Sequence, residues 1–129
     1  MNQEELVTIA VEAKEKAYAP YSHFRVGAAL VTEDGRVFTG VNVENASFGA
    51  TCCAERTAVF KAISEGCREI KAVAITSDSE HFTYPCGICR QVLAEFGKND
   101  MLVLCSNREG KYKSYRLEEL LPEAFREVK

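Results

Sequence analysis

Apolar residues recur at spacings of three and four along several stretches of the chain, the pattern of helices that bury one face. In the first stretch, Leu6, Ile9, Ala10 and Ala13 fall on one side, with glutamates and lysines on the other. Gly66 follows the second stretch and supplies a C-terminal stop. Together with a short closing helix, the predicted helices span residues 2–17, 53–65, 85–97 and 117–121.

Shorter apolar runs between these helices predict five strands, over residues 24–31, 36–43, 70–76, 101–105 and 111–115. Glu33-Asp34-Gly35 has the Asp-Gly signature of a hairpin turn between the first two. The continuously apolar run after Ile70 indicates a strand covered on both faces. A hairpin followed by β-α-β-α-β predicts an α/β fold, with a five-stranded mixed sheet between helices in a three-layer α/β/α arrangement. We expect one domain spanning residues 1–129.

Composition narrows the function classes. Hydrophobic residues make up 47% of the 129 residues, charged residues 27%, and the formal net charge is −3 with no long basic run. That balance argues against a protein that binds the backbone of DNA or RNA. The polar, acidic N-terminus is unlike a signal peptide, and no apolar run reaches the roughly 20 residues that a membrane span requires. We therefore expect a cytoplasmic location, where cysteines more often bind metal than form disulfides.

Three short segments combine into one predicted zinc site: Cys53-Ala54-Glu55, then Cys86 and Cys89 about thirty residues later. Three thiolates leave a fourth position on Zn²⁺ open for water, as in catalytic sites. The joint pattern, a ligand two residues before Glu and a later P-C-x-x-C, is the signature of zinc-dependent nucleobase deaminases. It predicts one Zn²⁺ per chain, with Glu55 as the group that moves protons.

Both thiol-bearing segments are predicted at helix N-termini, where the helix dipole favours thiolates. Cys52 competes with Cys53, but the ligand-x-Glu spacing selects Cys53. Arg56 is predicted to donate hydrogen bonds to one or both neighbouring thiolates. The alternative interpretation is that Arg56 is a solvated arginine on the face of the helix. For Glu55 the alternative is an acid that complements the helix dipole. Cys67 and Cys105 have no metal spacing and are interpreted as a loop thiol and a core thiol.

With these motifs the chain resembles the cytidine deaminases, in their short, homotetrameric form with a three-cysteine zinc site. The similarity is carried by four segments and a C-terminal stretch, spread in order over nearly the whole chain: Ala17 to Leu30 (A-Y-A-P-Y-S-H-F-R-V-G-A-A-L), Gly40 to Ala46, Cys53 to Ala58, Pro85 to Val92, and Glu119 to Phe125.

The resemblance implies zinc-dependent hydrolytic deamination of cytidine and 2′-deoxycytidine to uridine and 2′-deoxyuridine, with release of ammonia, in pyrimidine salvage. Glu55 would carry protons between the attacking water, N3 of the ring and the leaving ammonia. The residues implied to contact the substrate are Phe24, Asn42 and Glu44 at the ribose, and the Ala54 backbone and Phe125 at the base. From the residues alone, Asn42 and Glu44 share one face of a strand and could equally face solvent, whereas Phe24 and Phe125 would be assigned to the core.

Two positions depart from the common family pattern. Phe48 lies in the segment Ala46 to Ala50, which in this family reaches a neighbouring subunit's active site, and some members have tyrosine there. Ile88 stands where many relatives have a smaller residue, and we expect it to tighten the wall behind the zinc.

Three alternatives remain beside this interpretation. A deaminase of a cytosine-containing drug, of the blasticidin type, shares the C-A-E and P-C-x-x-C motifs, although the segments around Tyr18 and Asn42 favour a nucleoside. A polynucleotide-editing deaminase would need a basic channel for a single strand. A non-enzymatic zinc module would need a fourth protein ligand, for which Cys52 is the nearby thiol.

Overall fold

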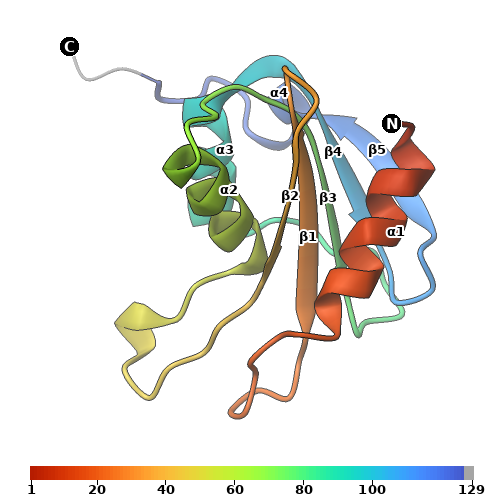
Figure 1. Ribbon diagram of the computed structural model, residues 1–129, viewed down its shortest axis with the longest axis vertical. Helices are drawn as coiled ribbons and strands as arrows, with labels where there is room; N and C mark the ends of the chain where they lie inside the picture. The colour runs from red at the N-terminus through yellow and green to blue at the C-terminus, as the bar shows by residue number, and fades with distance from the viewer. Residues whose placement is uncertain (127–129) are drawn as a thin grey trace.

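The computed structural model describes residues 1–126 and has a five-stranded sheet between two layers of helices (Figure 1). Its elements run in the order α1 (Gln3–Lys14), β1 (Val26–Thr32), β2 (Val37–Val41), η1 (Phe48–Ala50), α2 (Ala54–Ser64), β3 (Ile70–Ser77), α3 (Gly87–Phe96), β4 (Gly97–Ser106), β5 (Tyr112–Arg116) and α4 (Leu117–Leu120). The last three residues of the predicted domain, 127–129, lie outside the described residues. The α/β prediction is confirmed.

The sheet has the strand order β2-β1-β3-β4-β5. Antiparallel pairing joins β1 to β2, β1 to β3, and β4 to β5. The β3–β4 pair is parallel, and α3 connects its two strands. The sheet is therefore mixed, as predicted.

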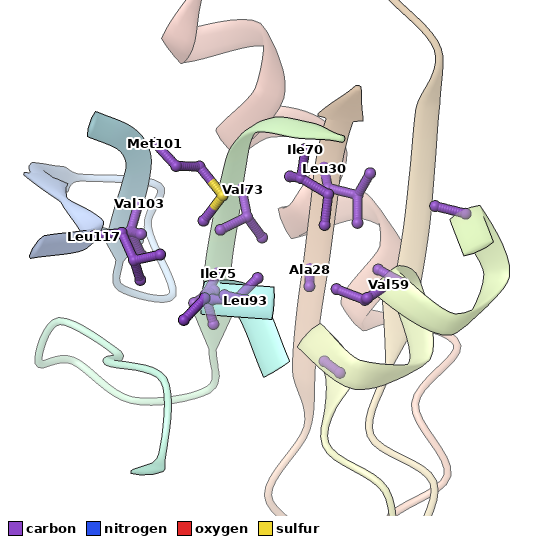
Figure 2. Close-up of a cluster of buried hydrophobic side chains, with 14 of the residues drawn as sticks. Ala28, Leu30, Val59, Ile70, Val73, Ile75, Leu93, Met101, Val103 and Leu117 are labelled. Carbon is purple, nitrogen blue, oxygen red and sulfur yellow. The ribbon is translucent and has the colours of Figure 1, made fainter. Parts of the chain in front are cut away.

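Helix α1 covers one face of the sheet, while α2, α3 and α4 cover the other (Figure 1). The larger core lies on the second face, where Leu30, Val73, Ile75 and Val103 from three strands meet Val59 and Leu93 from α2 and α3 (Figure 2). Ala72 and Ala74 of β3 point the other way, toward α1. The expectation that this strand is covered on both faces is confirmed.

Two glycines let the helices approach the sheet closely. A Cβ on Gly27 of β1 would lie 2.3 Å from the carbonyl oxygen of Ala10 in α1. A Cβ on Gly40 of β2 would lie 2.4 Å from both the Ala54 carbonyl oxygen and the Ala58 nitrogen of α2. Gly40 thus brings the first turn of α2 directly against the backbone of β2.

Helix ends follow the local signals in the sequence. The Asn2 side chain accepts a hydrogen bond from the Glu5 backbone, and Glu5 reaches back to Asn2 in a capping box, so α1 starts at Gln3. Gly66, at φ 90°, ends α2 as predicted. Among residues 1–126, no helix has the length and apolar character needed to cross a membrane.

Candidate metal centre and active site

Two helix N-termini bring the three predicted thiols together. Cys53 is the N-cap residue of α2, Cys86 is the N-cap residue of α3, and Cys89 lies one turn further into α3. The two antiparallel hydrogen bonds between Val43 and Cys52 close the loop after β2 and deliver the chain to the start of α2. The prediction that both segments begin helices is confirmed.

The spacing of the sulfur atoms fits a tetrahedral ion. The Sγ atoms of Cys53, Cys86 and Cys89 lie within 4.8 Å of one another, and those of Cys53 and Cys86 are 3.8 Å apart. Two thiolates that bind one Zn²⁺ at about 2.3 Å each, at a tetrahedral angle, are separated by about 3.8 Å. Cys52 does not belong to this group, and Cys105 is buried in the core as predicted. Cys67, interpreted as a loop thiol, is also buried.

The thiols differ in how easily they lose a proton. Hydrogen bonds from Cys89 and then from Arg56 lower the pKa of Cys53 to about 5. The pKa of Cys89 is raised, first by its hydrogen bond to Cys53 and then by burial. Cys53 is therefore the more acidic of these two thiols, and a bound cation would favour the thiolate form of both.

Glu55 lies in the first turn of α2 and is only 4% exposed. Burial, followed in importance by the negative charge of Cys53, raises the pKa of this carboxyl to about 7. A helix-dipole acid on the surface would instead be exposed and readily ionised. The burial of Glu55 beside the thiols therefore favours a chemical role.

Arg56 is turned toward the thiols. Its Nη2 donates a hydrogen bond to Cys53 Sγ at 3.5 Å, and this contact raises the pKa of the guanidinium further. Among the described residues, its buried Nε–H has no hydrogen-bond partner. The prediction that Arg56 contacts a neighbouring thiolate is confirmed for Cys53, and the solvated alternative is wrong.

Asn42 and Glu44 follow the end of β2, which stops at Val41, so neither lies on the strand where the sequence placed them. The Asn42 side chain accepts a hydrogen bond from the Val26 backbone and donates one to the Phe24 carbonyl, both at 2.8 Å. Glu44 accepts from the backbone amides of Tyr21 and Ser22 and from the Ser22 hydroxyl. Both side chains therefore organise the segment that carries Phe24.

The aromatic and apolar residues near the site are more exposed than expected. Phe24 and Phe125 are on the surface, so assigning them to the core was wrong. Ile88 is 62% exposed and does not pack behind the thiols, because α3 turns its second residue away from the core. Phe48 is 86% exposed. Ala54, by contrast, is fully buried against β2.

Sequence reasoning missed several polar residues that hold the site in place. Arg90 bridges the Pro85 carbonyl, next to Cys86, and the Leu120 carbonyl, both at 2.8 Å. Gln91 donates a hydrogen bond to the Phe125 carbonyl at 2.6 Å, which ties the C-terminal segment to α3. The contacts to Leu120 and Phe125 join residues 30 and 34 positions apart, and no local sequence pattern predicts them.

Comparisons with known proteins agree with this geometry. A family model described as "Cytidine and deoxycytidylate deaminase zinc-binding region" matches residues 1–105. The chain is 50% identical over 125 residues to a cytidine deaminase from Halalkalibacterium halodurans, covering 97% of this chain and 95% of that protein. It is 44% identical over 116 residues to one from Mycobacterium tuberculosis, covering 90% and 84%.

Solved structures give the same result for the fold. The crystal structure of a cytidine deaminase from Burkholderia pseudomallei superposes with a TM-score of 0.92 at 49% identity, covering 97% of this chain and 100% of that one. The cytidine deaminase from Mycobacterium tuberculosis gives a TM-score of 0.85 at 42% identity, covering 97% and 98%. With this match in sequence and fold over nearly its whole length, the chain belongs to the cytidine deaminase family.

Proposed function

We propose that the protein catalyses the hydrolytic deamination of cytidine and 2′-deoxycytidine to uridine and 2′-deoxyuridine, with release of ammonia. The observation that carries the proposal is the group of three thiols at two helix N-termini with the buried Glu55 beside it. A purely structural zinc site would close with a fourth protein ligand. Cys52, the nearest candidate, lies outside the group.

Cys53, Cys86 and Cys89 would hold one Zn²⁺. When bound, the ion supplies a Lewis acid that makes a water molecule nucleophilic at neutral pH. Glu55 accepts a proton from the water that attacks C4 and delivers it to N3 of the ring. It then takes the proton of the new C4 hydroxyl and delivers it to the departing amino group, so that ammonia leaves as the C4 carbonyl forms. Its buried position keeps bulk water from competing for those protons.

Arg56 offsets the excess negative charge of three thiolates around a divalent ion. Its hydrogen bond to the Cys53 sulfur would reduce the electron density that this thiolate donates to a bound ion, and so would keep the ion a stronger Lewis acid. We assign this tuning to Arg56.

We assign the contacts with the substrate's sugar to Phe24, Asn42 and Glu44. The ionised Glu44 carboxylate has about four lone-pair sites, and three contacts from Tyr21 and Ser22 use three of them. The hydrogen bond from Ser22 is the main cause of its lowered pKa, so Glu44 is ionised and can accept from a ribose hydroxyl. The base is assigned to the Ala54 backbone and the Phe125 ring.

An ultraviolet assay of cytidine conversion, on protein of known zinc content, tests the activity. We expect turnover that a chelator abolishes and zinc restores. The Glu55→Gln variant should retain about one zinc per chain and lose nearly all turnover, because its amide cannot carry the proton. Substantial activity in that zinc-loaded variant would refute the role of Glu55. Blasticidin S and a cytosine-containing oligonucleotide, assayed in parallel, separate a nucleoside enzyme from the alternatives.

We also propose a homotetramer in which the segment Ala46 to Ala50 meets a neighbouring active site. All five of its residues are exposed, and the segment projects from the body of the molecule beyond β2 (Figure 1). Phe24, Ile88 and Phe125 leave apolar surface uncovered, and Ile88 lies between two of the thiols, so a second copy would bury apolar area there. Sedimentation equilibrium measures the assembly, and a monomeric, fully active enzyme would contradict this proposal.

A cytoplasmic location and a role in pyrimidine salvage complete the proposal. All six cysteines are free, and a centre of three thiolates needs a compartment that keeps thiols reduced. Fractionation of cells that produce the protein tests the location.

A further inference from the structure

The backbone from Tyr21 to Arg25 is irregular and leads into β1 at Val26, yet every amide from Tyr21 to Val26 donates a hydrogen bond. The amides of Tyr21 and Ser22 donate to Glu44, that of His23 to the Ala19 carbonyl, that of Phe24 to the Ser22 hydroxyl, that of Arg25 to Asp78 and that of Val26 to Asn42. His23 is held at φ 58°, a conformation that a non-glycine residue keeps only when its surroundings impose it. These hydrogen bonds fix the segment in place, although only its last residue, Val26, belongs to a strand.

Asp78 makes the most distant of these contacts, since it follows β3 and lies 53 positions along the chain from Arg25. Its Oδ2 accepts from the Arg25 backbone amide at 3.0 Å and from Arg25 Nε at 3.1 Å, and its Oδ1 accepts from Arg25 Nη2 at 3.0 Å. In return, the Asp78 amide donates to the Arg25 carbonyl at 3.1 Å. Asp78 thus binds both the backbone and the side chain of Arg25, the residue next to Phe24.

Two more charges complete this cluster. Lys14, at the end of α1, is 5% exposed, and its Nζ lies 3.2 Å from Asp78 Oδ1. Glu15 accepts from Arg25 Nη1 at 2.8 Å. The four side chains carry two positive and two negative charges, so the buried lysine is neutralised. The cluster joins α1, β3 and the segment that carries Phe24.

We propose that Asp78 is a positioning residue for the sugar of the substrate. It acts through Arg25 and does not itself touch the nucleoside. By fixing Arg25, it determines the position of Phe24 and of the Phe24 carbonyl, to which Asn42 donates a hydrogen bond. It thereby sets the relative positions of the residues that contact the sugar. This inference rests on the proposed function. Because a sugar subsite misplaced by about 1 Å can cost as much as 100-fold in rate, a residue outside the site is expected to matter.

The experiment compares cytidine with 2′,3′-dideoxycytidine, which lacks the 2′- and 3′-hydroxyls but keeps the 5′-hydroxyl, in the Asp78→Ala and Asp78→Asn variants. Zinc content and thermal melting are measured on the same preparations. We expect kcat/KM for cytidine to fall about tenfold in Asp78→Ala, mainly through KM, and that for the dideoxy substrate to fall no more than about twofold. Asp78→Asn, which retains an acceptor for the Arg25 amide, should recover part of the loss.

The matched control is Arg108→Ala, which breaks the exposed Arg108–Glu80 pair of the neighbouring loop at 2.9 Å. That pair does not reach Arg25, so both substrates should be unaffected by the change. An equal loss on both substrates in Asp78→Ala, or no loss at all, would overturn the proposal. If Asp78→Ala does not fold, Asp78→Asn and Arg25→Lys carry the same comparison. Inactivity of the zinc-loaded wild type on cytidine would instead refute the proposed function.

Discussion

Arg56 offers a direct test of how a three-thiolate site is tuned. Its guanidinium donates to Cys53 Sγ, and its buried Nε–H finds no partner among the described residues, so its placement is not explained by packing alone. We expect Arg56→Ala to keep zinc and to lower kcat for cytidine by about 10- to 100-fold, the usual effect of losing an outer hydrogen bond to a metal ligand. The measurement is turnover per bound zinc.

A suitable control is Arg68→Ala, since Arg68 is an exposed arginine in the loop after α2. That variant should retain both zinc and turnover. An Arg56→Ala enzyme with full zinc and unchanged kcat would show that the hydrogen bond has no part in catalysis.

The adjacent cysteines test the identity of the ligand. Cys53 lies in the group of three sulfurs, whereas the backbone of Cys52 pairs with Val43 and its thiol lies outside the group. Cys53→Ser is therefore expected to lose most of the bound zinc, and Cys52→Ser to keep about one zinc per chain. Metal analysis after dialysis decides the matter. Zinc loss from Cys52→Ser would favour a four-thiolate structural site.

At the scale of elements, Gly40 sets how closely α2 packs on the sheet. In Gly40→Ala, the new Cβ would meet the Ala54 carbonyl and the Ala58 nitrogen at 2.4 Å, and both are backbone atoms that cannot turn away. The helix must shift, and Cys53 and Glu55 shift with it. We expect a loss of about 1–3 kcal/mol or more in the free energy of unfolding, together with weaker zinc retention.

Gly27→Ala provides the comparison on the opposite face. Its Cβ would meet the Ala10 carbonyl of α1 at 2.3 Å, so a similar loss of stability is expected. Because α1 carries none of the three thiols, zinc retention should change less than in Gly40→Ala. Chelator competition and urea unfolding of both variants measure the two quantities. Equal zinc loss in the pair would show that the effect is general destabilisation.

The elements themselves were largely predictable, because each depends on a local pattern. The hairpin turn, the stop at Gly66 and the four α-helices of residues 1–126 were predicted from sequence, whereas the short 3-10 helix η1 was not. The boundaries were less accurate where long-range pairing decides them. Strand β4 begins at Gly97 and not at Met101, because Gly97 pairs with Ile70 across the parallel ladder. Strand β2 ends at Val41, because the Asn42 side chain turns back to bond the start of β1.

The reactive side chains of the candidate site could be predicted from the sequence, but the long-range hydrogen bonds that position its segments could not. The spacing of Cys53, Cys86 and Cys89 predicted that their thiols would meet, and the structure places their sulfur atoms within 4.8 Å of one another. The hydrogen bonds of Asp78, by contrast, join residues more than fifty positions apart, and nothing in the sequence marks them as partners. The exposure of Phe48 also has no local signal, because a solvent-facing aromatic looks like a core residue in sequence.

At the scale of the whole molecule, the sheet separates the group of thiols from the helix that reaches the charge cluster. The thiols lie at the start of α2 and α3 on one face, whereas α1 covers the other and reaches the cluster around Asp78 through Lys14. The start of β1 and the end of β3 pair beside that cluster, so α1 is tied to both strands at one end of the sheet. Changes in charge there should therefore affect the stability of the entire fold.

The same cluster predicts how stability depends on pH. The hydrogen bonds from Arg25 and the charge of Lys14 lower the pKa of Asp78 to about 2, against about 3.9 in an unfolded chain. Between these values the unfolded chain binds a proton that the folded protein does not. The stabilisation is therefore complete above about pH 5 and is lost as the pH falls from about 4 toward 2. Because the Asp78 side chain is 27% exposed, we expect its ionised carboxylate to contribute about 1–2 kcal/mol to the free energy of unfolding.

Urea unfolding of zinc-free protein, in a chelator, isolates this effect from the loss of metal that acid also causes. The quantity to follow is the difference in unfolding free energy between the wild type and Asp78→Asn. It should be constant between pH 5 and 7 and shrink below about pH 4, because only the wild type can take up the proton at this position. A difference that stays constant down to about pH 2.5 would mean that Asp78 supports the fold through shape and not through charge. In that case Lys14 would need another partner for its buried ammonium group.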